Sequence, residues 1–423
     1  MKTSALTLLT FLLTLCLGCS PKVEKELSFI QENTNFATAQ THLMLEKVGK
    51  ATHKNFPRTT NAQGKLLVTS IYDWTPGFFP GTLWYLYELT EDSVWRAKAE
   101  EWTYQLEDIQ HFKSNHDIGF MMYCSYGNAE RLASRPSYKE ILIQSAKSLC
   151  TRYNSTIRAI ESWNSRKAWN GNYWSFPVII DNMMNLELLC YASRASGDST
   201  YRNLAIQHAN TTLKNHFRPD HSSYHVVNYD EQTGAALHHQ TCQGYSDNST
   251  WARGQAWAVY GYTMMYRETH QPQFLEAAQQ FADYFLAHLP KDLVPLWDFN
   301  AGQEGYIPDG KSYAKRFTDR QQSPRDASAA AVVCSALFEL GEICGNPDYT
   351  RWAVRMLKSL ASPAYRAVLG ENAHFLLMHS TGSIPHQNEI DVPLTYADYY
   401  FVEALARYKR LLTTGKVITN QPE

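Results

Sequence analysis

Two aspartates stand where a carboxylate could act as an acid or a base. Asp181 follows the apolar pair Ile179-Ile180 and precedes a segment with little charge. Burial there should raise the pKa of Asp181, which suits a general acid. Asp117 lies in the sequence H-D-I-G at 116–119 and could point into a cavity. Either aspartate could instead cap a helix by accepting a backbone N–H.

The segment 243–257 is the richest in residues that bind sugars. Trp251 and Trp257 are six residues apart, with Arg253 between them. Arginine offers a planar fork that matches a carboxylate, and tryptophan offers a flat face for stacking. Together they predict a pocket for an acidic sugar rather than a neutral one. Ser249 and Thr250 could also cap the helix that follows.

A third segment, 73–84, contains two glycines and two prolines that fix a turn just before a helix. The turn displays aromatic side chains, Trp74 among them. Loops between helices are where functional residues tend to gather. Trp74 is therefore either a pocket wall or part of a hydrophobic staple.

Composition limits the classes of protein that can present these segments. The chain has 423 residues, of which 44% are apolar and 19% charged, so neither a disordered nor a fibrous protein fits. The formal charge is −2, which provides no electrostatic footprint for nucleic acid. The 11 Trp, 26 Tyr and 18 Phe fit either a large helical core or a sugar-binding surface.

The apolar residues recur at three- and four-residue spacing, which is typical of helices. No linker, charge run or low-complexity segment divides the chain after its N-terminal leader. The pattern predicts an all-α single domain, with successive helical hairpins closed into an α/α toroid. A superhelical solenoid competes with it but lacks a clean repeat. The expected helices are Glu26–Val48, Gly81–Leu89, Ser93–Gln110, Ile118–Ser134, Pro136–Asn154, Val178–Ala195, Ser199–His216, Thr250–Glu268, Pro272–His288, Asp326–Leu340, Pro347–Ser362 and Ala397–Leu412.

Taken together, the motifs resemble glycoside hydrolase family 88, the unsaturated glucuronyl hydrolases. The run S-T-W-A-R-G-Q-A-W at 249–257 is the most specific of them. The others are H-D-I-G at 116–119, I-D at 180–181, W-D-F at 297–299, R-D-A-S-A at 325–329 and D-Y-Y-F-V-E-A-L at 398–405. The resemblance implies an (α/α)6 barrel that acts on lyase-generated oligosaccharides, and the sugar source expected is glycosaminoglycan.

By that resemblance the reaction is hydration of a C4=C5 double bond in the non-reducing uronic acid. Asp181 would protonate C4 and help water to add at C5, after which the hemiketal opens and expels the rest of the sugar chain. Asp117 would be the second essential carboxylate. The family needs no metal and no cofactor, and this sequence has no cluster of metal ligands. The resemblance places seven residues in the substrate pocket: Trp74, His116, His225, Gln243, Trp251, Arg253 and Trp257.

Two positions need a comment. Family members often have His before the Gln that begins the segment 243–257, where this chain has Cys242. The loop 379–386 falls where some members contact a sulfate, but it lacks the lysine of sulfate-preferring relatives, and it could be a plain surface loop.

Residues 1–19 have the features of a secretory leader. Lys2 precedes the apolar run Leu6–Leu17, which is too short to span a membrane. The run ends at a lipobox-like site, so Cys19 is the expected lipidation site and 20–423 the catalytic domain. We therefore expect an exported protein, a periplasmic or outer-membrane lipoprotein of a Gram-negative bacterium, that meets the membrane only through its lipid anchor. Six further cysteines form no CxxC pair, so no zinc site is expected.

The sequence leaves two other functions open. One is an unsaturated rhamnogalacturonyl hydrolase that acts on pectin fragments. The other is a sugar-binding toroid without catalysis. The partners expected are unsaturated uronic-acid oligosaccharides, and the oligomeric state is not predicted.

Overall fold

The structure, a computed structural model, describes residues 21–168, 171–309 and 323–418. The expected leader 1–19, with Cys19, lies outside the described residues. Within the described ranges, no helix combines the length and the apolar character needed to cross a bilayer.

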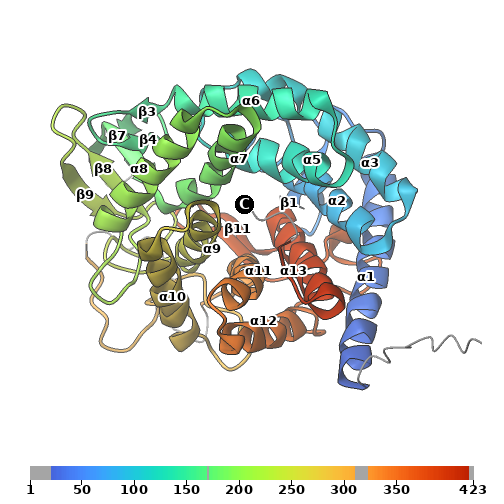
Figure 1. Cartoon of the computed structure of the whole chain (residues 1–423). Helices are drawn as coiled ribbons and strands as arrows, with labels where there is room; N and C mark the ends of the chain where they lie inside the picture. Colours follow the sequence, from blue (N-terminus) through green and yellow to red (C-terminus); the bar gives the residue numbers. More distant parts are fainter. Residues whose placement is uncertain (1–20, 169–170, 310–322, 419–423) are drawn as a thin grey trace, which may run out of the picture.

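Twelve successive helical segments alternate between an outer and an inner ring, which makes an (α/α)6 barrel (Figure 1). The predicted toroid is therefore confirmed. The outer ring consists of α1 (Pro21–Val48), α3 (Ser93–Tyr104), α6 (Pro136–Cys150), α8 (Ser199–Asn215), α10 (Pro272–Ala287) and α12 (Pro347–Leu360). The inner ring consists of α2 (Phe78–Thr90), α4 (Ile118–Met122) with α5 (Asn128–Ala133), α7 (Leu186–Ser196), α9 (Ala252–Thr269), α11 (Ala327–Ile343) and α13 (Thr395–Thr414).

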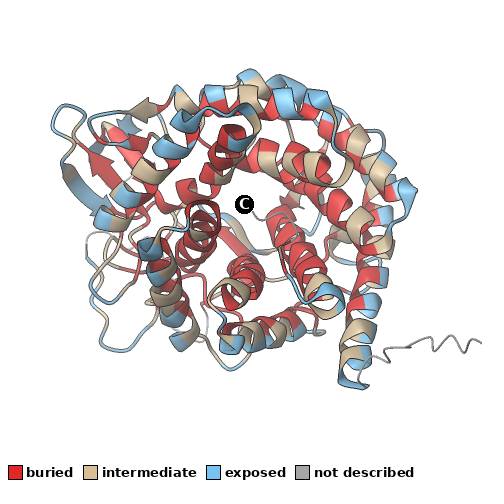
Figure 2. Cartoon of the chain, viewed as in Figure 1, coloured by how far each residue is buried: buried red, intermediate tan, exposed pale blue. Residues whose placement is uncertain are grey.

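The two rings differ in burial because they differ in sequence (Figure 2). Helix α12 buries Tyr349, Ala353 and Met356 at three- to four-residue spacing and exposes its other face, as an outer helix should. Helix α11 is buried along nearly its whole length. Its many alanines and serines let neighbouring helices approach it from several sides.

The turn signals in the sequence act as predicted at the hairpin between α7 and α8. Gly197 ends α7 in the left-handed region, with φ at 78°. Asp198 then caps α8 by accepting the backbone N–H of Thr200.

Four of the expected helices are wrong in detail. The expected helix Ser93–Gln110 ends at Tyr104 and is followed by a 3-10 turn at Glu107–His111, and the expected helix Pro136–Asn154 ends at Cys150, before a strand at Tyr153–Asn154. The expected helix Ile118–Ser134 is α4, a π-helical turn at Tyr123–Gly127, and α5. The expected helix Val178–Ala195 begins instead with a strand and a 3-10 segment, Ile180–Asn185, before α7. Apolar periodicity alone does not separate these forms over short stretches.

Short strands lie at the ends of the helices, in a fold that is otherwise α-helical. Strands β7 (Phe176–Ile179), β8 (Val226–Tyr229) and β9 (Ala236–Gln240) form an antiparallel sheet in the order β7-β8-β9. Four two-stranded hairpins join β1 (Phe56–Thr60) to β2 (Leu66–Thr69), β3 (Tyr153–Asn154) to β4 (Ala159–Ile160), β5 (Arg166–Lys167) to β6 (Tyr173–Trp174), and β10 (Ser380–Ser383) to β11 (Asn388–Val392).

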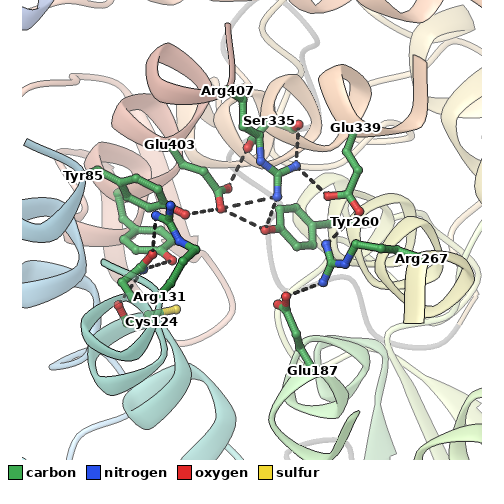
Figure 3. A network of polar contacts seen from close by, with 12 residues as sticks. Tyr85, Cys124, Arg131, Glu187, Tyr260, Arg267, Ser335, Glu339, Glu403 and Arg407 are labelled. Atoms are coloured by element: carbon green, nitrogen blue, oxygen red, sulfur yellow. Dashed lines mark hydrogen bonds and ion pairs between the residues drawn. The ribbon is translucent and has the colours of Figure 1, made fainter. Parts of the chain in front are cut away.

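A buried polar network ties the inner helices α2, α9, α11 and α13 together (Figure 3). Glu403 of α13 accepts hydrogen bonds from Tyr85 at 2.6 Å, Tyr260 at 3.0 Å and Ser335 at 2.6 Å. Arg407 lies 3.0 Å from Glu339 of α11. These contacts reach across the barrel axis. They hold the inner helices in place relative to one another, because no sheet connects these helices.

A cavity of about 570 Å³ lies at this network. Tyr85, Glu187, Arg267 and Glu403 are among its lining residues, whereas Asp117 and Asp181 are not. Fourteen residues of α9 separate Arg253 from Arg267, which at 1.5 Å per residue is about 21 Å. The cavity therefore belongs to the end of the barrel away from the predicted catalytic residues.

Candidate active site

The six inner helices begin at the same end of the barrel. Their first turns meet around the ring in four contacts: Phe78 with Phe120, the Phe120 N–H with Asn185, Arg253 with Asp326, and Arg253 with Tyr396. Each helix N-terminus carries a partial positive charge. An anionic ligand is therefore favoured at this end.

The small sheet brings Asp181 beside His225. Ile179 at the end of β7 pairs with Val226 at the start of β8, and the Ile180 N–H donates to the His225 carbonyl at 3.0 Å. As a result, His225 Nε2 lies 3.7 Å from Asp181 Oδ2, although 44 positions separate the two residues in the sequence.

Hydrogen bonds fix the tautomer of His225. Its Nδ1 accepts the backbone N–H of Cys242 at 3.1 Å and of Gln243 at 3.2 Å. The ring proton is therefore assigned to Nε2, which faces Asp181. Burial, and next the charge of Arg253, lowers the pKa of His225 well below its ordinary value. The contact with Asp181 thus involves a neutral imidazole rather than an ion pair.

The pKa of the Asp181 carboxyl lies in the range that a proton donor at neutral pH needs. Burial raises its pKa to about 7, while the Arg253 charge and a hydrogen bond from the Trp257 side chain lower it. The side chain is 13% exposed, so a ligand can reach it. Its Oδ2 has no hydrogen-bond partner among the described residues. The predicted rise in the pKa of Asp181 is confirmed.

Asp117 lies close to Asp181 because α4 packs directly on the 3-10 segment. A Cβ on Gly119 would lie 2.4 Å from the Asn185 Cα, so glycine allows this approach. Burial, and next the charge of Asp181, raises the pKa of Asp117 well above its usual range. Asp117 precedes α4 but its side chain makes no capping hydrogen bond, so the helix-cap explanation is wrong for this residue.

His116 lies behind Asp117 and is also neutral. The Asn185 Oδ1 accepts the Phe120 N–H at 2.9 Å, which turns the Asn185 amide nitrogen toward His116 Nδ1 at 3.3 Å. The other ring nitrogen, Nε2, lies 3.3 Å from Asp117 Oδ1. Burial lowers the pKa of His116 to about 3. A neutral imidazole therefore lies beside Asp117 and adds no charge there.

Aromatic rings surround the two carboxyls, as the sequence predicted. Trp74 lies 4.9 Å from the Tyr396 ring and 5.6 Å from the Phe120 ring. The Phe120 ring lies 5.2 Å from Trp257. Trp251 packs on His225 at 4.4 Å. Phe120 also lines the cavity at the other end, so its ring forms a floor between the cavity and the carboxyls.

Arg253 requires a correction. The sequence suggested that its guanidinium fork anchors a substrate carboxylate, but the fork is occupied. Nη1 donates to Asp326 Oδ2 and to the Thr381 carbonyl, both at 2.6 Å, and Nη2 donates to the Gly382 carbonyl at 2.7 Å. The side chain is 2% exposed. Arg253 therefore joins α9, α11 and the β10–β11 hairpin and acts on Asp181 through its charge.

Gln243 lies at the same hairpin. Its side-chain amide donates to the Gly382 carbonyl at 3.2 Å, which leaves its oxygen available to a ligand. The loop 379–386 is therefore a wall of the site and not a plain surface loop. The Cys242 position contributes its backbone N–H to His225, and its thiol is buried.

The sequence reasoning missed three supporting residues. Asp326 pairs with Arg253 and caps α11, Asn185 orients His116, and Phe120 forms the floor. Asp326 lies within the motif R-D-A-S-A at 325–329 and Phe120 directly follows H-D-I-G at 116–119, but their roles depend on partners far away in the sequence. Among the described residues, no group of three or more His, Cys, Asp or Glu could hold a metal ion.

The barrel and the paired carboxyls define a class: an (α/α)6-barrel glycoside hydrolase with two neighbouring aspartates of raised pKa among aromatic rings. The model of Glycosyl Hydrolase Family 88 matches residues 44–403, and the chain belongs to this family. It is 49% identical to the unsaturated glucuronyl hydrolase of Formosa agariphila, over 85% of this chain and 86% of that protein.

Two further similarities agree with this family. The unsaturated chondroitin disaccharide hydrolase of Streptococcus pyogenes serotype M1 is 30% identical over 84% of this chain and 86% of its own length. The crystal structure of an unsaturated glucuronyl hydrolase specific for heparin superposes with a TM-score of 0.82. That structure is 43% identical in sequence and covers 91% of this chain and 98% of its own.

Proposed function

We propose that this glycoside hydrolase removes the non-reducing Δ4,5-unsaturated uronic acid from lyase-generated glycosaminoglycan oligosaccharides. The observation that carries the proposal is the pair of buried carboxyls, Asp117 and Asp181, whose pKa values are raised at the mouth of the inner helix ring. A raised pKa keeps a carboxyl protonated near neutral pH, as a general acid requires.

The proposed reaction is a hydration. Protonated Asp181 gives its proton to C4 of the double bond, and water adds to C5 while its proton returns to the carboxyl pair. The resulting hemiketal opens and expels the rest of the sugar chain. His225 and His116 hold the two carboxyls without adding charge, and Trp74, Trp251 and Trp257 form the walls. Gln243 is proposed to bind a substrate hydroxyl.

The site and the relatives weigh against the two alternatives. The relatives named for chondroitin and for heparin support a glycosaminoglycan source over pectin fragments. Paired carboxyls with raised pKa values are typical of active sites and argue against a toroid that only binds sugar.

The test uses unsaturated disaccharides from chondroitin, hyaluronan, heparin and pectin digests. Hydration consumes the conjugated double bond, so the near-ultraviolet absorbance should fall with at least one glycosaminoglycan disaccharide. Asp181→Asn should lose a factor of about 10²–10⁴ in kcat. Asp198→Asn is the matched control, because asparagine also caps helix α8 well. Unchanged absorbance with every substrate would refute the function, and an active Asp181→Asn would refute the role of Asp181.

We also propose that residues 1–19 are cleaved and that Cys19 is acylated, which makes the protein an exported lipoprotein. The support is the order of a basic residue, a short apolar run and a small-residue site before Cys19. Labelling of expressing cells with a radioactive fatty acid should mark the parent protein and not Cys19→Ser. Equal labelling of both would refute the anchor.

A further inference from the structure

Arg166 is an exposed arginine that is held in place at the edge of the site. It lies on the β5–β6 hairpin, where Arg166 pairs with Trp174. Its guanidinium carbon is 4.3 Å from the centre of the Trp163 ring and 5.5 Å from that of Trp174. The two indoles are themselves stacked at 5.8 Å. Arginine stacks well on aromatic faces, so this exposed side chain has a defined position.

The position of Arg166 relates it to the catalytic residues. Its Nη2 lies 3.7 Å from the Cys242 Sγ, and the Cys242 backbone N–H is bonded to His225. The His225 ring in turn lies 3.7 Å from Asp181. The charge of Arg166 also contributes, after burial, to the lowered pKa of His386, which is on the β10–β11 hairpin across the site. Arg166 therefore stands between the outer surface and the carboxyl pair.

Arg166 has no acidic partner among the residues that the structure describes. The buried arginines differ from it: Arg253 is paired with Asp326, and Arg267 with Glu339. The nearby hairpin adds polar groups without a negative charge, since Ser383 Oγ lies 2.7 Å from His386 Nδ1. Among the described residues, the positive charge of Arg166 at the edge of the site therefore has no carboxylate within ion-pair distance.

We propose that Arg166 binds an oxyanion on the sugar joined to the unsaturated uronic acid and so selects charged leaving groups. The inference rests on the proposed function, which places the unsaturated residue at Asp181 and leaves the next sugar toward solvent. A stacked guanidinium presents its N–H edge to an oxyanion and forms charge-assisted hydrogen bonds. Its position is set before binding, so little side-chain entropy is lost on binding. In a disaccharide the oxyanion is a sulfate ester, and in a longer oligosaccharide it can be a carboxylate.

The experiment compares Arg166→Gln with Lys167→Gln. Lys167 is the adjacent exposed residue of the same strand, so its variant removes the same charge from the same hairpin. The substrates are one unsaturated disaccharide with and without a sulfate on its hexosamine, and an unsulfated unsaturated tetrasaccharide. Arg166→Gln should raise the KM for the sulfated disaccharide by about 10–100-fold, as expected for charge-assisted hydrogen bonds. Its kcat/KM for the unsulfated disaccharide should stay within about twofold of the parent.

The tetrasaccharide tells the two sources of the oxyanion apart, because only it offers a second carboxylate. A raised KM with the sulfated disaccharide alone assigns Arg166 to sulfate, and a raised KM with the tetrasaccharide as well assigns it to both groups. Equal losses of kcat/KM on the sulfated and the unsulfated disaccharide would overturn the inference, since they indicate that the packing of the Trp163 and Trp174 rings has collapsed. Equal losses in Arg166→Gln and Lys167→Gln would also overturn it, since they indicate long-range attraction only. A parent enzyme inactive on every substrate would instead refute the proposed function.

Discussion

The hydrogen bond from Trp257 to Asp181 offers a direct test of the proton-donor assignment. Burial raises the pKa of Asp181 to about 7, and the Trp257 side chain is one of three groups that lower it against this effect, after the Arg253 charge and a backbone hydrogen bond. Trp257→Phe keeps an aromatic ring in this wall but removes the indole N–H, which is the only donor of the side chain. The pKa of Asp181 should therefore rise.

The size of the change follows from the type of bond. A hydrogen bond to a charged group is worth about 1.5–3 kcal/mol, and one pKa unit corresponds to about 1.4 kcal/mol. The loss should move the pKa of Asp181 up by about 1–2 units. If the protonated carboxyl is the active form, the alkaline limb of the pH profile moves up by the same amount.

The assay is the pH dependence of kcat/KM, which reports the ionisation of the free enzyme. The absorbance of an unsaturated disaccharide is followed between about pH 5 and 10, a range chosen to span the expected limb. Trp84→Phe is the control, because this buried indole bonds Thr103 on α3 and does not touch Asp181. An alkaline limb that stays in place or moves down in Trp257→Phe would refute the assignment. A limb that moves equally in Trp84→Phe would show an indirect effect of packing.

Three further predictions concern stability. The pKa of Asp181 is raised on folding, so ionisation of its carboxyl destabilises the folded state. This loss of folding free energy is absent below about pH 4, is complete above about pH 7, and amounts to at most about 4 kcal/mol. Asp181→Asn should therefore raise the melting temperature at pH 8 and hardly change it at pH 4, and a gain of equal size at both pH values would contradict this reasoning. Glu403→Gln breaks the buried network and should lower the free energy of unfolding in urea by about 3–5 kcal/mol, with kcat of the folded enzyme unchanged; a loss below about 1 kcal/mol would show that the network is not needed. The six cysteines of the described chain are unpaired, so a reducing agent should leave the melting temperature unchanged, and a drop would reveal a disulfide.

Several elements of the fold follow from local sequence, and their boundaries show where local information ends. Gly197 and Asp198 mark the end of one helix and the start of the next, because the left-handed turn and the cap depend only on neighbouring residues. The expected helix Ile118–Ser134 fails at Tyr123–Gly127, where the inner ring imposes a π-helical turn. The break at Phe176–Ile179 also depends on distant sequence, since this strand pairs with β8.

The candidate site divides in the same way. Asp117, Asp181 and the tryptophans could be identified by type and context, because an acid beside apolar residues and an arginine between indoles have few other uses. The role of Arg253 could not be predicted. Its partners Asp326, Thr381 and Gly382 lie 73 to 129 positions away in the sequence. Only folding brings them to the Arg253 guanidinium, which is then buried and hydrogen-bonded to them.

The sequence by itself determined the class of fold, the family resemblance and the identity of the two carboxyls. Helical periodicity, caps and motif residues are local properties that the order of amino acids carries directly. The tertiary structure alone decided that the pKa values of both carboxyls are raised, since these depend on burial and on groups brought together by folding. It also decided that the Arg253 guanidinium is buried and paired with Asp326 while Arg166 stacks at the exposed edge of the site, because such contacts depend on distance in space and not on position along the chain.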